Sequence, residues 1–380
     1  LPQLKAKCVE AGVPAPESTA KTSKVWQDWL DEYGEQVPWV RNIARYRSAN
    51  RLLSQFHQIR PRVYMSDEGF ERLPATLTYC GATTGRWTSG GDHFNVQQLN
   101  RNEVEGFDIR GVIRAPEGYS LVFCDWAQIE ARIIAWYVGQ DEILVPLREG
   151  ASDLYALYAK AWNLLPQDVE HFEEWCKLPG NDPMLRQVVK AGALACGFGQ
   201  RAAGLHAKNP HMTMEQCEFI VDTYHQKNPK VLAWWETLKE KIRRGALSSS
   251  KSFSLQLPSG RTLYYRGLFK KLCQSSKGKP YWAWAYKPNK YSTRVVNVSL
   301  LSNNVVQGIA RDLMKNTVLE MRRQGCPAFV IIHDEGGFLV KDEDLDHMVP
   351  LIKGVMESVP PWAQGLPLLA EPKVLKVYKK

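Results

Sequence analysis

Two short apolar runs that each end in acidic residues constrain the fold of this chain most strongly. The first is YSLVFCDW, which ends on Asp125 and Trp126, and the second is AFVIIHDE, which ends on Asp334 and Glu335. Short apolar runs of this kind, bounded by turn residues, are typical of buried strands. The sequence therefore predicts two buried strands, far apart in the chain, that each carry a carboxylate at one end.

The segments around these two strands are predicted to be mostly helical. Residues 1–60 contain TSKVWQDWLDEY, with Thr or Ser as its cap, and then VRNIARYRSANRLLSQFHQI, both with apolar residues at helical spacing. Residues 151–246 are helical again, most clearly in DLYALYAKAWNLL and LRQVVKAGALACGFG, and one long helix is expected over about 300–323. Two helical lobes are therefore expected.

Two hairpins and a loop are also expected. SFSLQLPSGRTLYYRG should turn at residues 258–260. AFVIIHDEGGFLV should form two strands joined at residues 334–337, which places its acids at the turn. Residues 275–291 are rich in Lys, Gly and aromatic residues, which predicts an exposed loop.

The length and charge of the chain favour several subdomains and a polyanionic partner. Its 380 residues exceed what one hydrophobic core usually serves. Lys and Arg outnumber Asp and Glu by 49 to 40, for a net charge of +9. No apolar run is long enough to cross a membrane. The eight cysteines are scattered without a CxxC pair, so we expect a reducing compartment and neither zinc nor a disulfide framework. The chain begins at Leu1 with no leader pattern, as in a trimmed chain or the tail of a longer polypeptide.

Asp125 and Asp334 are candidate metal ligands, although each has an ordinary alternative role. A single Asp after a strand is more often a helix cap, and acids in a Gly-containing turn more often belong to the turn itself. Addition of a nucleotide to a primer end, however, needs two divalent cations about 3.5 to 4 Å apart. One cation activates the attacking oxygen, and the other bridges the triphosphate. Magnesium prefers hard oxygen ligands, so two carboxylates on strand ends would suffice.

A stripe of four residues on one predicted helix is a candidate nucleotide site. Arg186, Lys190, Leu194 and Phe198 recur every four residues and so share one helix face. The two cations could grip a triphosphate, with Lys190 near the leaving group, while Leu194 and Phe198 pack on the sugar and base. The alternative is an amphipathic core helix with two solvated charges.

The stretch TTGRWTSGGDHFNVQQLN places hydrogen-bond donors among flexible glycines. Arg86, Asn95, Gln97 and Gln98 suit the minor groove of DNA, whose acceptors are nearly independent of sequence. The alternative here is an ordinary polar loop.

Together these four segments resemble the motifs of the family A DNA polymerases, the polymerase I group that includes many phage replicases. TTGRWTS resembles the family's TGRLSS block, DWAQIEAR its motif A DYSQIELR, RQVVK followed by GFG its motif B, and IHDE its motif C VHDE. They occur in the family's order at compatible spacings. The resemblance covers residues 1–380, with an N-terminal lobe similar to the later part of a thumb as its weakest portion.

The resemblance implies an α+β (mixed) fold in the form of a right hand, with an antiparallel-sheet palm, helical fingers and a partial helical thumb. The thumb-like lobe would span residues 1–75, and the first part of the palm, with motif A, residues 76–150. The fingers, with motif B and an extended hairpin or loop, would span 151–290, and the second part of the palm, with motif C, 291–380.

The resemblance also implies a template- and primer-dependent DNA polymerase, for replication or repair, that adds dNMP from dNTP to a primer 3′ end. Two Mg²⁺ ions would serve it, with Mn²⁺ as a substitute, and its partners would be primer-template DNA and dNTPs, with no membrane. We expect a monomer in the cytoplasm of a bacterial or phage-infected cell, or else in an organelle. No proofreading nuclease is visible, so an exonuclease or other domain would lie upstream or be absent, and replisome proteins are further candidate partners.

By motif, the resemblance assigns roles to individual residues. Asp125 and Asp334 would bind the metals, Glu335 would be an auxiliary catalytic residue, and Lys190 would act as a general acid toward pyrophosphate. Glu130 would crowd the sugar 2′ position and exclude ribonucleotides. The nucleotide-binding set would be Gln128, Glu130, Tyr155, Arg186, Lys190, Leu194 and Phe198, and the DNA-binding set Arg86, Asn95, Gln97, Arg110, Asn303, Gln307 and His333.

Several departures from the family pattern bear on substrate handling. Leu194 replaces the family's aromatic residue and Phe198 its later Tyr, so sugar discrimination and templating-base handling are expected to differ. Tyr155 stands in DLY where many relatives have DIH. The stretch from Gln274 to Tyr291 is longer than expected, and its interleaved basic and aromatic residues suit either stacking on single-stranded template or a surface flap.

Three other functions stay open at this point. A single-subunit RNA polymerase of related fold would carry both aspartates, but Glu130 argues against it. A non-catalytic primer-template-binding protein would have no need to keep Asp125, Asp334 and the two cations of the stripe together. A metal-dependent nuclease leaves the stripe unexplained.

Overall fold

The chain divides into two compact units. The structure is a computed structural model, and it describes residues 2–19, 24–67, 69–89, 95–99, 103–104, 106–274, 278–289 and 291–379. Unit 1 comprises Leu1–Thr76, Gly91–Arg114 and Val377–Lys380, and unit 2 comprises Leu77–Gly90 and Ala115–Lys376. Both units are therefore built from segments that are separated in the sequence.

Unit 1 is mostly helical, as the sequence predicts. Its helices are α1 (Pro2–Glu10), α2 (Lys24–Tyr33) and α3 (Pro38–Ile59), followed by the short turns η1 (Arg60–Arg62), η2 (Val96–Gln98) and η3 (Ile109–Val112), with a two-stranded ladder of β1 (Tyr64–Met65) and β2 (Glu71–Arg72). Helix α3 begins at a proline, whose fixed φ suits the first helical position. The predicted Thr or Ser cap of α2 lies outside the described residues.

A small cluster holds the helices of unit 1 together. Cys8, Trp26, Trp29 and Val40 are its buried members. The two indoles stack with ring centroids 5.3 Å apart, and Nε1 of Trp29 donates a hydrogen bond to the carbonyl oxygen of Pro14 at 2.6 Å. The core of this part of the unit is therefore narrow and depends on two tryptophans.

The last described residues of the chain complete unit 1. Val377 forms an antiparallel bridge with Arg114, and the amide of Tyr378 donates to the carbonyl oxygen of Ile113 at 2.9 Å. The Tyr378 side chain is buried, and the guanidinium of Arg110 lies 5.1 Å from its ring centroid. Residues near both ends of the chain thus belong to one folded body.

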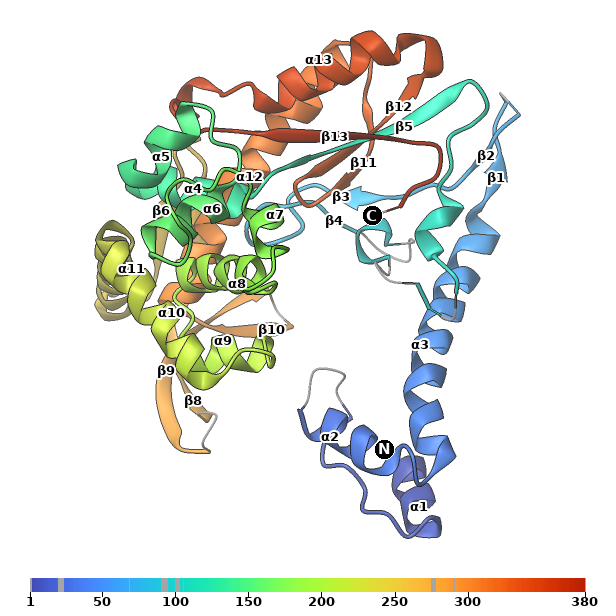
Figure 1. Ribbon diagram of the computed structural model, residues 1–380, viewed down its shortest axis with the longest axis vertical. Helices are drawn as coiled ribbons and strands as arrows, with labels where there is room; N and C mark the ends of the chain where they lie inside the picture. Colours follow the sequence, from blue (N-terminus) through green and yellow to red (C-terminus); the bar gives the residue numbers. More distant parts are fainter. Residues whose placement is uncertain are drawn as a thin grey trace. The chain divides into compact units, whose positions relative to one another are not determined.

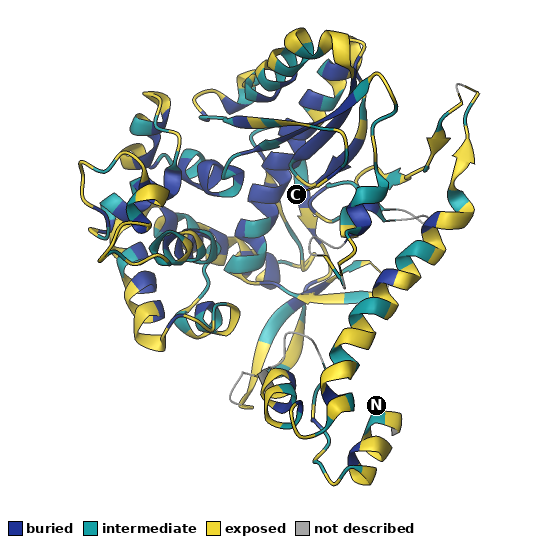
Figure 2. Cartoon of the chain, turned by 45° about the vertical axis from the view of Figure 1, so that its right-hand side comes forward, coloured by how far each residue is buried: buried dark blue, intermediate teal, exposed yellow. Residues whose placement is uncertain are grey.

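Unit 2 is organised around a four-stranded antiparallel sheet (Figure 1). Its strands are β5 (Tyr119–Trp126), β11 (Ala328–Ile332), β12 (Glu335–Lys341) and β13 (Ala370–Leu375), in the order β11-β12-β5-β13. Helix α13 (Leu345–Glu357) packs on β5, β12 and β13, and helix α12 (Val298–Arg323) packs on β11 and α13. Strands β5 and β12 are drawn mostly as buried in Figure 2, and the last three residues of β11 are buried as well, whereas β13 is largely open to solvent.

In the sequence, the remaining helices of unit 2 follow β5 and precede the long helix α12. They are α4 (Ile129–Val138), α5 (Asp141–Arg148), α6 (Leu154–Ala161), α7 (Phe172–Cys176), α8 (Leu185–Gly197), α9 (Ala202–Lys208), α10 (Met214–Lys227) and α11 (Pro229–Leu247). Helix α8 packs on α4, α6 and α10, and α12 packs on α4 and α11. The predicted second helical lobe is therefore confirmed, and it shares one core with the sheet.

Two β-hairpins and a three-stranded sheet complete the described strands of unit 2. Strands β3 (Leu77–Thr78) and β4 (Thr88–Ser89) pair, β6 (Phe253–Gln256) pairs with β7 (Thr262–Tyr265) at the predicted turn, and β8 (Phe269–Gln274), β9 (Pro280–Asn289) and β10 (Ser292–Val295) form a three-stranded sheet. The predicted loop over 275–291 was wrong for most of its length, because β9 occupies it. Alternating aromatic and small residues, the pattern of a strand, outweigh its Lys and Gly content.

Short η4 (Asp342–Asp344) and η5 (Pro361–Ala363) turns flank α13. Among the residues that the structure describes, none of the helices has the length and apolar character needed to span a membrane.

Candidate active site

Three acidic residues lie at one end of the four-stranded sheet. Glu335 lies opposite Asp125 in the β12–β5 ladder, and Ile332 lies opposite Glu335 in the β11–β12 ladder. The hairpin turn therefore consists of His333 and Asp334. Asp125 and Asp334 are half-buried, whereas Glu335 is buried. The structure thus brings together the two predicted metal ligands and their predicted auxiliary acid.

The turn lies earlier than the predicted 334–337, and packing explains why. His333 has a φ of +58°, which supplies the left-handed residue that a tight turn needs. Gly336 and Gly337 belong to β12 instead. A Cβ on Gly337 would lie 2.9 Å from Cε1 of Phe123, so this glycine serves close packing in the sheet and not chain reversal.

Arg86 supplies a positive charge to this group of acids. It lies between β3 and β4, and its guanidinium is ion-paired with Asp334. The preceding Gly85 has a φ of +84°, and its carbonyl oxygen accepts a hydrogen bond from Nε of Arg311 at 2.8 Å. Arg311 is buried on α12 between Tyr79 and Trp87, with centroids 4.7 and 5.1 Å away, and so anchors the turn that carries Arg86.

Glu130 lies in the first turn of α4 and belongs to the same charged group. Its carboxylate accepts a hydrogen bond from Nε2 of Gln307 on α12. Burial, followed by the negative charge of Asp334, raises the pKa of Glu130, while Arg86 and the Gln307 hydrogen bond act in the opposite direction. Glu130 is therefore a carboxyl group held in place from a second helix, beside the acids of the sheet.

Gln128 connects the end of β5 to the start of α6. Its backbone is left-handed, with a φ of +54°. Its side chain donates to Oδ1 of Asp153 at 3.0 Å and accepts from the amide of Leu154 at 3.0 Å. A strained backbone of this kind persists only where neighbouring contacts hold it, and these two hydrogen bonds do so.

Asp153 also orients Arg186 of α8. Its Oδ2 lies 3.2 Å from Nε of Arg186, and that guanidinium lies 5.7 Å from the ring centroid of Tyr155. Sequence reasoning missed Asp153, although its position as the N-cap of α6 was a usable signal. Tyr155 is buried, and burial raises its pKa to about 12, so its hydroxyl stays protonated at neutral pH.

The predicted stripe follows α8 for three of its four residues. Arg186, Lys190 and Leu194 lie on the helix, Lys190 being exposed, whereas α8 ends at Gly197 and Phe198 is the C-cap residue. The stripe is therefore interrupted before its last member.

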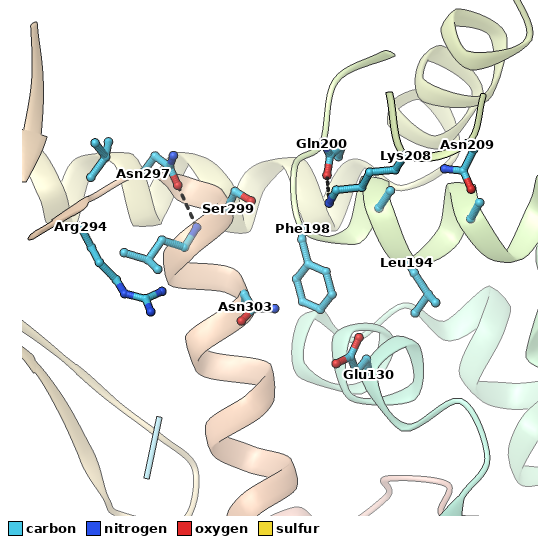
Figure 3. A pocket seen from close by; sticks show the side chains of 14 residues that line it. Glu130, Leu194, Phe198, Gln200, Lys208, Asn209, Arg294, Asn297, Ser299 and Asn303 are labelled. Atoms are coloured by element: carbon cyan, nitrogen blue, oxygen red, sulfur yellow. Dashed lines mark hydrogen bonds between the residues drawn. The ribbon is translucent and has the colours of Figure 1, made fainter. Parts of the chain in front are cut away.

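A cavity of about 710 Å³ lies beside the second half of α8 and the start of α12. Figure 3 shows Glu130, Leu194, Phe198 and Asn303 around it, all predicted site residues. Arg186 and Lys190 are not among its lining residues. Residues that the sequence did not single out also line it: Gln200, Lys208, Asn209, Arg294, Asn297 and Ser299. Lys208 donates to Oε1 of Gln200 at 2.9 Å.

The other predicted DNA-binding residues lie in unit 1. Oδ1 of Asn95 accepts a hydrogen bond from the amide of Gln97 at 3.1 Å, which caps η2. Arg110 is only 4% exposed and contacts Tyr378, so its side chain serves the packing of unit 1. The predicted DNA contact at Arg110 stays a prediction.

Asp125 and Asp334 fit the chemistry of a magnesium site. Within the described part of the chain, no group of three or more His, Cys, Asp or Glu residues is arranged to hold a metal ion. Two carboxylates on neighbouring elements nevertheless offer the hard oxygen donors that Mg²⁺ prefers, since this ion retains several water ligands. The pairing of Asp334 with Arg86 indicates that this position already attracts a cation.

A family model for DNA polymerase family A matches residues 3–380. This chain belongs to DNA polymerase family A. The thermostable DNA polymerase I of Thermus aquaticus is 27% identical over 364 residues, which cover 94% of this family A chain and 39% of the relative. The DNA polymerase of Bacillus phage SP02 is 25% identical over 439 residues, which cover 97% of this chain and 64% of the relative.

A solved structure agrees with the family in fold. It is the POL domain of Pol1 from M. smegmatis in complex with DNA primer-template and dNTP, 20% identical, with a TM-score of 0.68 over 99% of this family A chain and 60% of that chain. The predicted mixed fold of a family A polymerase domain is therefore confirmed. The four predicted subdomains stay a prediction, because contacts divide the chain into two units.

Proposed function

We propose that this chain is a template- and primer-dependent DNA polymerase, which adds dNMP from dNTP to a primer 3′ end in replication or repair. The observation that supports the proposal is that Asp125 lies opposite Glu335, next to Asp334, at one end of the sheet in a family A chain, with Glu130 electrostatically coupled to Asp334. The relatives named above are DNA polymerases, and the matched solved structure holds primer-template DNA and dNTP.

Asp125 and Asp334 would hold two Mg²⁺ ions, or Mn²⁺ in their place. When bound, such ions activate the attacking 3′ oxygen and stabilise the charge of the triphosphate. Arg86 must give up its pairing with Asp334 for the carboxylate to accept a metal, which frees the guanidinium for the DNA minor groove. Glu335, opposite Asp125, would add negative potential without serving as a main ligand.

Arg186 and Lys190 on α8 would bind the triphosphate. Asp153 and Tyr155 restrict the Arg186 guanidinium, which lowers the entropy lost when it meets a phosphate. Lys190 is exposed and would donate a proton to the leaving pyrophosphate.

The sugar and base of the nucleotide would occupy the cavity beside α8. Leu194 and Phe198 would contact them, and Gln128 would position the turn before α4. Glu130, fixed by Gln307, would crowd the 2′ position of the sugar, so a ribose hydroxyl would meet a half-buried carboxylate. Because Leu194 stands where the family pattern has an aromatic residue, the base would be held by aliphatic packing.

Asn303, Gln307 and His333 from unit 2, with Asn95 and Gln97 from unit 1, would contact the primer-template. Their amide and imidazole groups suit backbone and minor-groove contacts that test shape and not sequence. We place the enzyme, as a monomer, in the cytoplasm of a bacterial or phage-infected cell, with an organelle as the alternative. An upstream exonuclease and replisome proteins would be its further partners.

Primer extension by aspartate variants tests the proposal. Asp125→Ala and Asp334→Ala should each lower the rate of dNTP addition with Mg²⁺ by about 10³-fold, since loss of a metal ligand removes several kcal/mol of transition-state stabilisation. Binding of primer-template, measured by fluorescence anisotropy, should change little. Asp346→Ala, at an exposed position of α13, is the matched control and should extend normally.

Robust extension by either aspartate variant would overturn the metal assignment. A parallel reaction with rNTPs distinguishes DNA synthesis from RNA synthesis. We expect extension with dNTPs and none with rNTPs. Equal extension with rNTPs would favour the RNA polymerase alternative, and no extension by the wild-type protein, with DNA binding retained, would favour the non-catalytic one.

A further inference from the structure

The sheet formed by β8, β9 and β10 has one face with an unusual composition. Residues that lie directly opposite each other in an antiparallel pair point to the same side of the sheet. Leu272 faces Trp282, and Lys270 faces Trp284, across the β8–β9 ladder. Because these pairs are two residues apart, both lie on one face, which we call the tryptophan face.

The tryptophan face continues onto β10. Arg294 lies opposite Tyr286, which is two residues beyond Trp284 on β9. The order along the face from the hairpin end is therefore the Leu272–Trp282 pair, then the Lys270–Trp284 pair, then Arg294. Apolar and cationic groups alternate over its whole length.

Large apolar side chains on this face are open to solvent. Trp282 is 64% exposed and Leu272 is 55% exposed. Nζ of Lys270 lies 4.4 Å from the ring centroid of Trp284, so the cation already lies over an aromatic surface. An exposed tryptophan on a projecting hairpin, which Figure 1 shows reaching away from the rest of unit 2, buries little area and contributes little to folding.

The charge of residues 269–295 indicates which kind of partner would bind the tryptophan face. Residues 269–295 contain seven Lys and Arg residues and no Asp or Glu. Such a segment attracts a polyanion. Exposed aromatic faces between cations suit unpaired bases, because every base has a π face that is inaccessible in a duplex stack.

The tryptophan face is continuous with the cavity beside α8. Arg294 lines that cavity together with Phe198 and Asn303, as Figure 3 shows. A strand that leaves the cavity past Arg294 could therefore reach Lys270, which covers the half-buried Trp284, and then the exposed Trp282.

We propose that the tryptophan face binds single-stranded DNA, namely the unpaired 5′ part of the template ahead of the cavity. Lys270 and Arg294 contact its phosphates, and an unpaired base stacks on Trp282. This inference rests on the proposed polymerase function. It shares Arg294 with the cavity proposed for the nucleotide, but the tested residues Lys270 and Trp282 do not line that cavity, so it fails or succeeds separately from the proposed function.

The test compares two double variants on two DNA substrates. Lys270→Ala/Trp282→Ala removes a cation and an aromatic ring from the tryptophan face. Lys271→Ala/Tyr281→Ala removes the same two kinds of group from the opposite face of the same strands, since Lys271 lies opposite Ala283 and Tyr281 opposite Cys273. One substrate is a primer-template with a template overhang of about ten nucleotides, and the other has an overhang of one.

We expect the tryptophan-face variant to bind the long-overhang substrate about ten- to a hundredfold more weakly than the wild-type protein, the loss expected for one stacked base and one phosphate contact. Binding and single-nucleotide extension of the short-overhang substrate should not change. The control variant should match the wild-type protein on both substrates. Trp282→Phe, which keeps an aromatic face, should retain most of the affinity.

Equal affinities of the wild-type protein and the tryptophan-face variant for the long overhang would overturn the inference and would favour a protein partner for this face. Equal weakening by the control variant, or on both substrates, would also overturn it. Single-nucleotide extension by the wild-type protein reports the proposed function itself. If the tryptophan-face variant binds the long overhang as tightly as the wild-type protein does, and the wild-type protein still extends primers, only the inference is rejected.

Discussion

Glu130 carries the most informative charge among the candidate site residues. It is a carboxyl group in a largely buried position, and the negative Asp334 lies near enough to raise its pKa further above the ordinary value of 4.5. The folded protein therefore holds a proton on Glu130 more tightly than the unfolded chain does. Ionisation of Glu130 therefore lowers the free energy of unfolding, at a position where a fixed carboxylate would discriminate between sugars.

Replacement of Glu130 by Gln should expose this cost as a pH dependence. Below the unfolded pKa both states are protonated, so Glu130→Gln and the wild-type protein should differ by a constant amount. As pH rises toward the raised folded pKa, the wild-type protein loses stability because its unfolded state releases the proton first, whereas the Gln variant has no proton to release. The excess stability of the variant should thus grow with pH and then level off.

Urea unfolding from pH 4 to pH 8, with a chelator present to keep divalent ions away, measures this difference. A flat difference across the range, or one that shrinks with rising pH, contradicts the assignment of a raised pKa to Glu130.

Single residues were predictable where one sequence signal sufficed. Asp125 and Asp334 follow apolar runs and match family motifs, so they were identified without a structure. Asp153 and Arg311 were missed because their roles arise from side-chain contacts between segments far apart in the chain: Asp153 with Arg186, and Arg311 with Gly85. Local patterns contain no information about such contacts, and for the same reason the burial of Arg110 was not foreseen.

At the scale of elements, the packing of α8 against its neighbours determines which side of the helix is covered and which side carries the stripe. Gly192 lies in α8 where the helix meets α10, and a Cβ there would overlap Cγ2 of Ile220 and lie 3.3 Å from Cη2 of Trp162. The absence of a side chain at this position allows the two helices to approach closely. Arg186 and Lys190 lie on the other side of α8, the side proposed to bind the triphosphate.

Alanine at Gly192 should destabilise the protein by about 1 to 3 kcal/mol, because the added methyl group overpacks a core that has no room for it. Gly354→Ala in α13 is the control, since nothing lies within 4 Å of the added Cβ and the position is exposed. There the greater helix propensity of alanine should stabilise the protein by up to about 1 kcal/mol. Thermal unfolding of both variants checks the contrast, and a neutral Gly192→Ala would show that α8 and α10 can separate at no cost.

Helices and strands were predicted correctly where their hydrophobic periodicity was clear. The long helices and the strands ending in Asp125 and Asp334 have clear periodicity, and their positions were correct to within a few residues. Strand β9 was mistaken for a loop because glycine and lysine residues dominated the composition of residues 275–291. The turn at His333 was misplaced because its glycines were attributed to chain reversal, whereas they serve close packing.

At the scale of the whole molecule, the two units differ in how much core supports them. The cluster of α1, α2 and α3 contains four buried apolar residues, whereas one extensive cluster joins the sheet and helices of unit 2. Small cores give low local stability. Hydrogen exchange followed by mass spectrometry should therefore show peptides from α2 exchanging through openings of much lower free energy than peptides from α12.

The control for this measurement is α11, which is shorter than α12, with 19 residues against 26, but belongs to the same extensive core of unit 2. Its protection should resemble that of α12. Equal protection of α2 and α12 would mean that both units unfold in one cooperative step.

The place of Tyr378 in unit 1 has a consequence for the order of synthesis. A ribosome makes Arg110 long before Tyr378, which lies 268 positions later in the chain. Until that residue emerges, the buried guanidinium of Arg110 lacks the ring that covers it. The part of unit 1 around Arg110 therefore cannot be completed as its own segments appear. It is completed only after residues 115–376 of unit 2 have been translated.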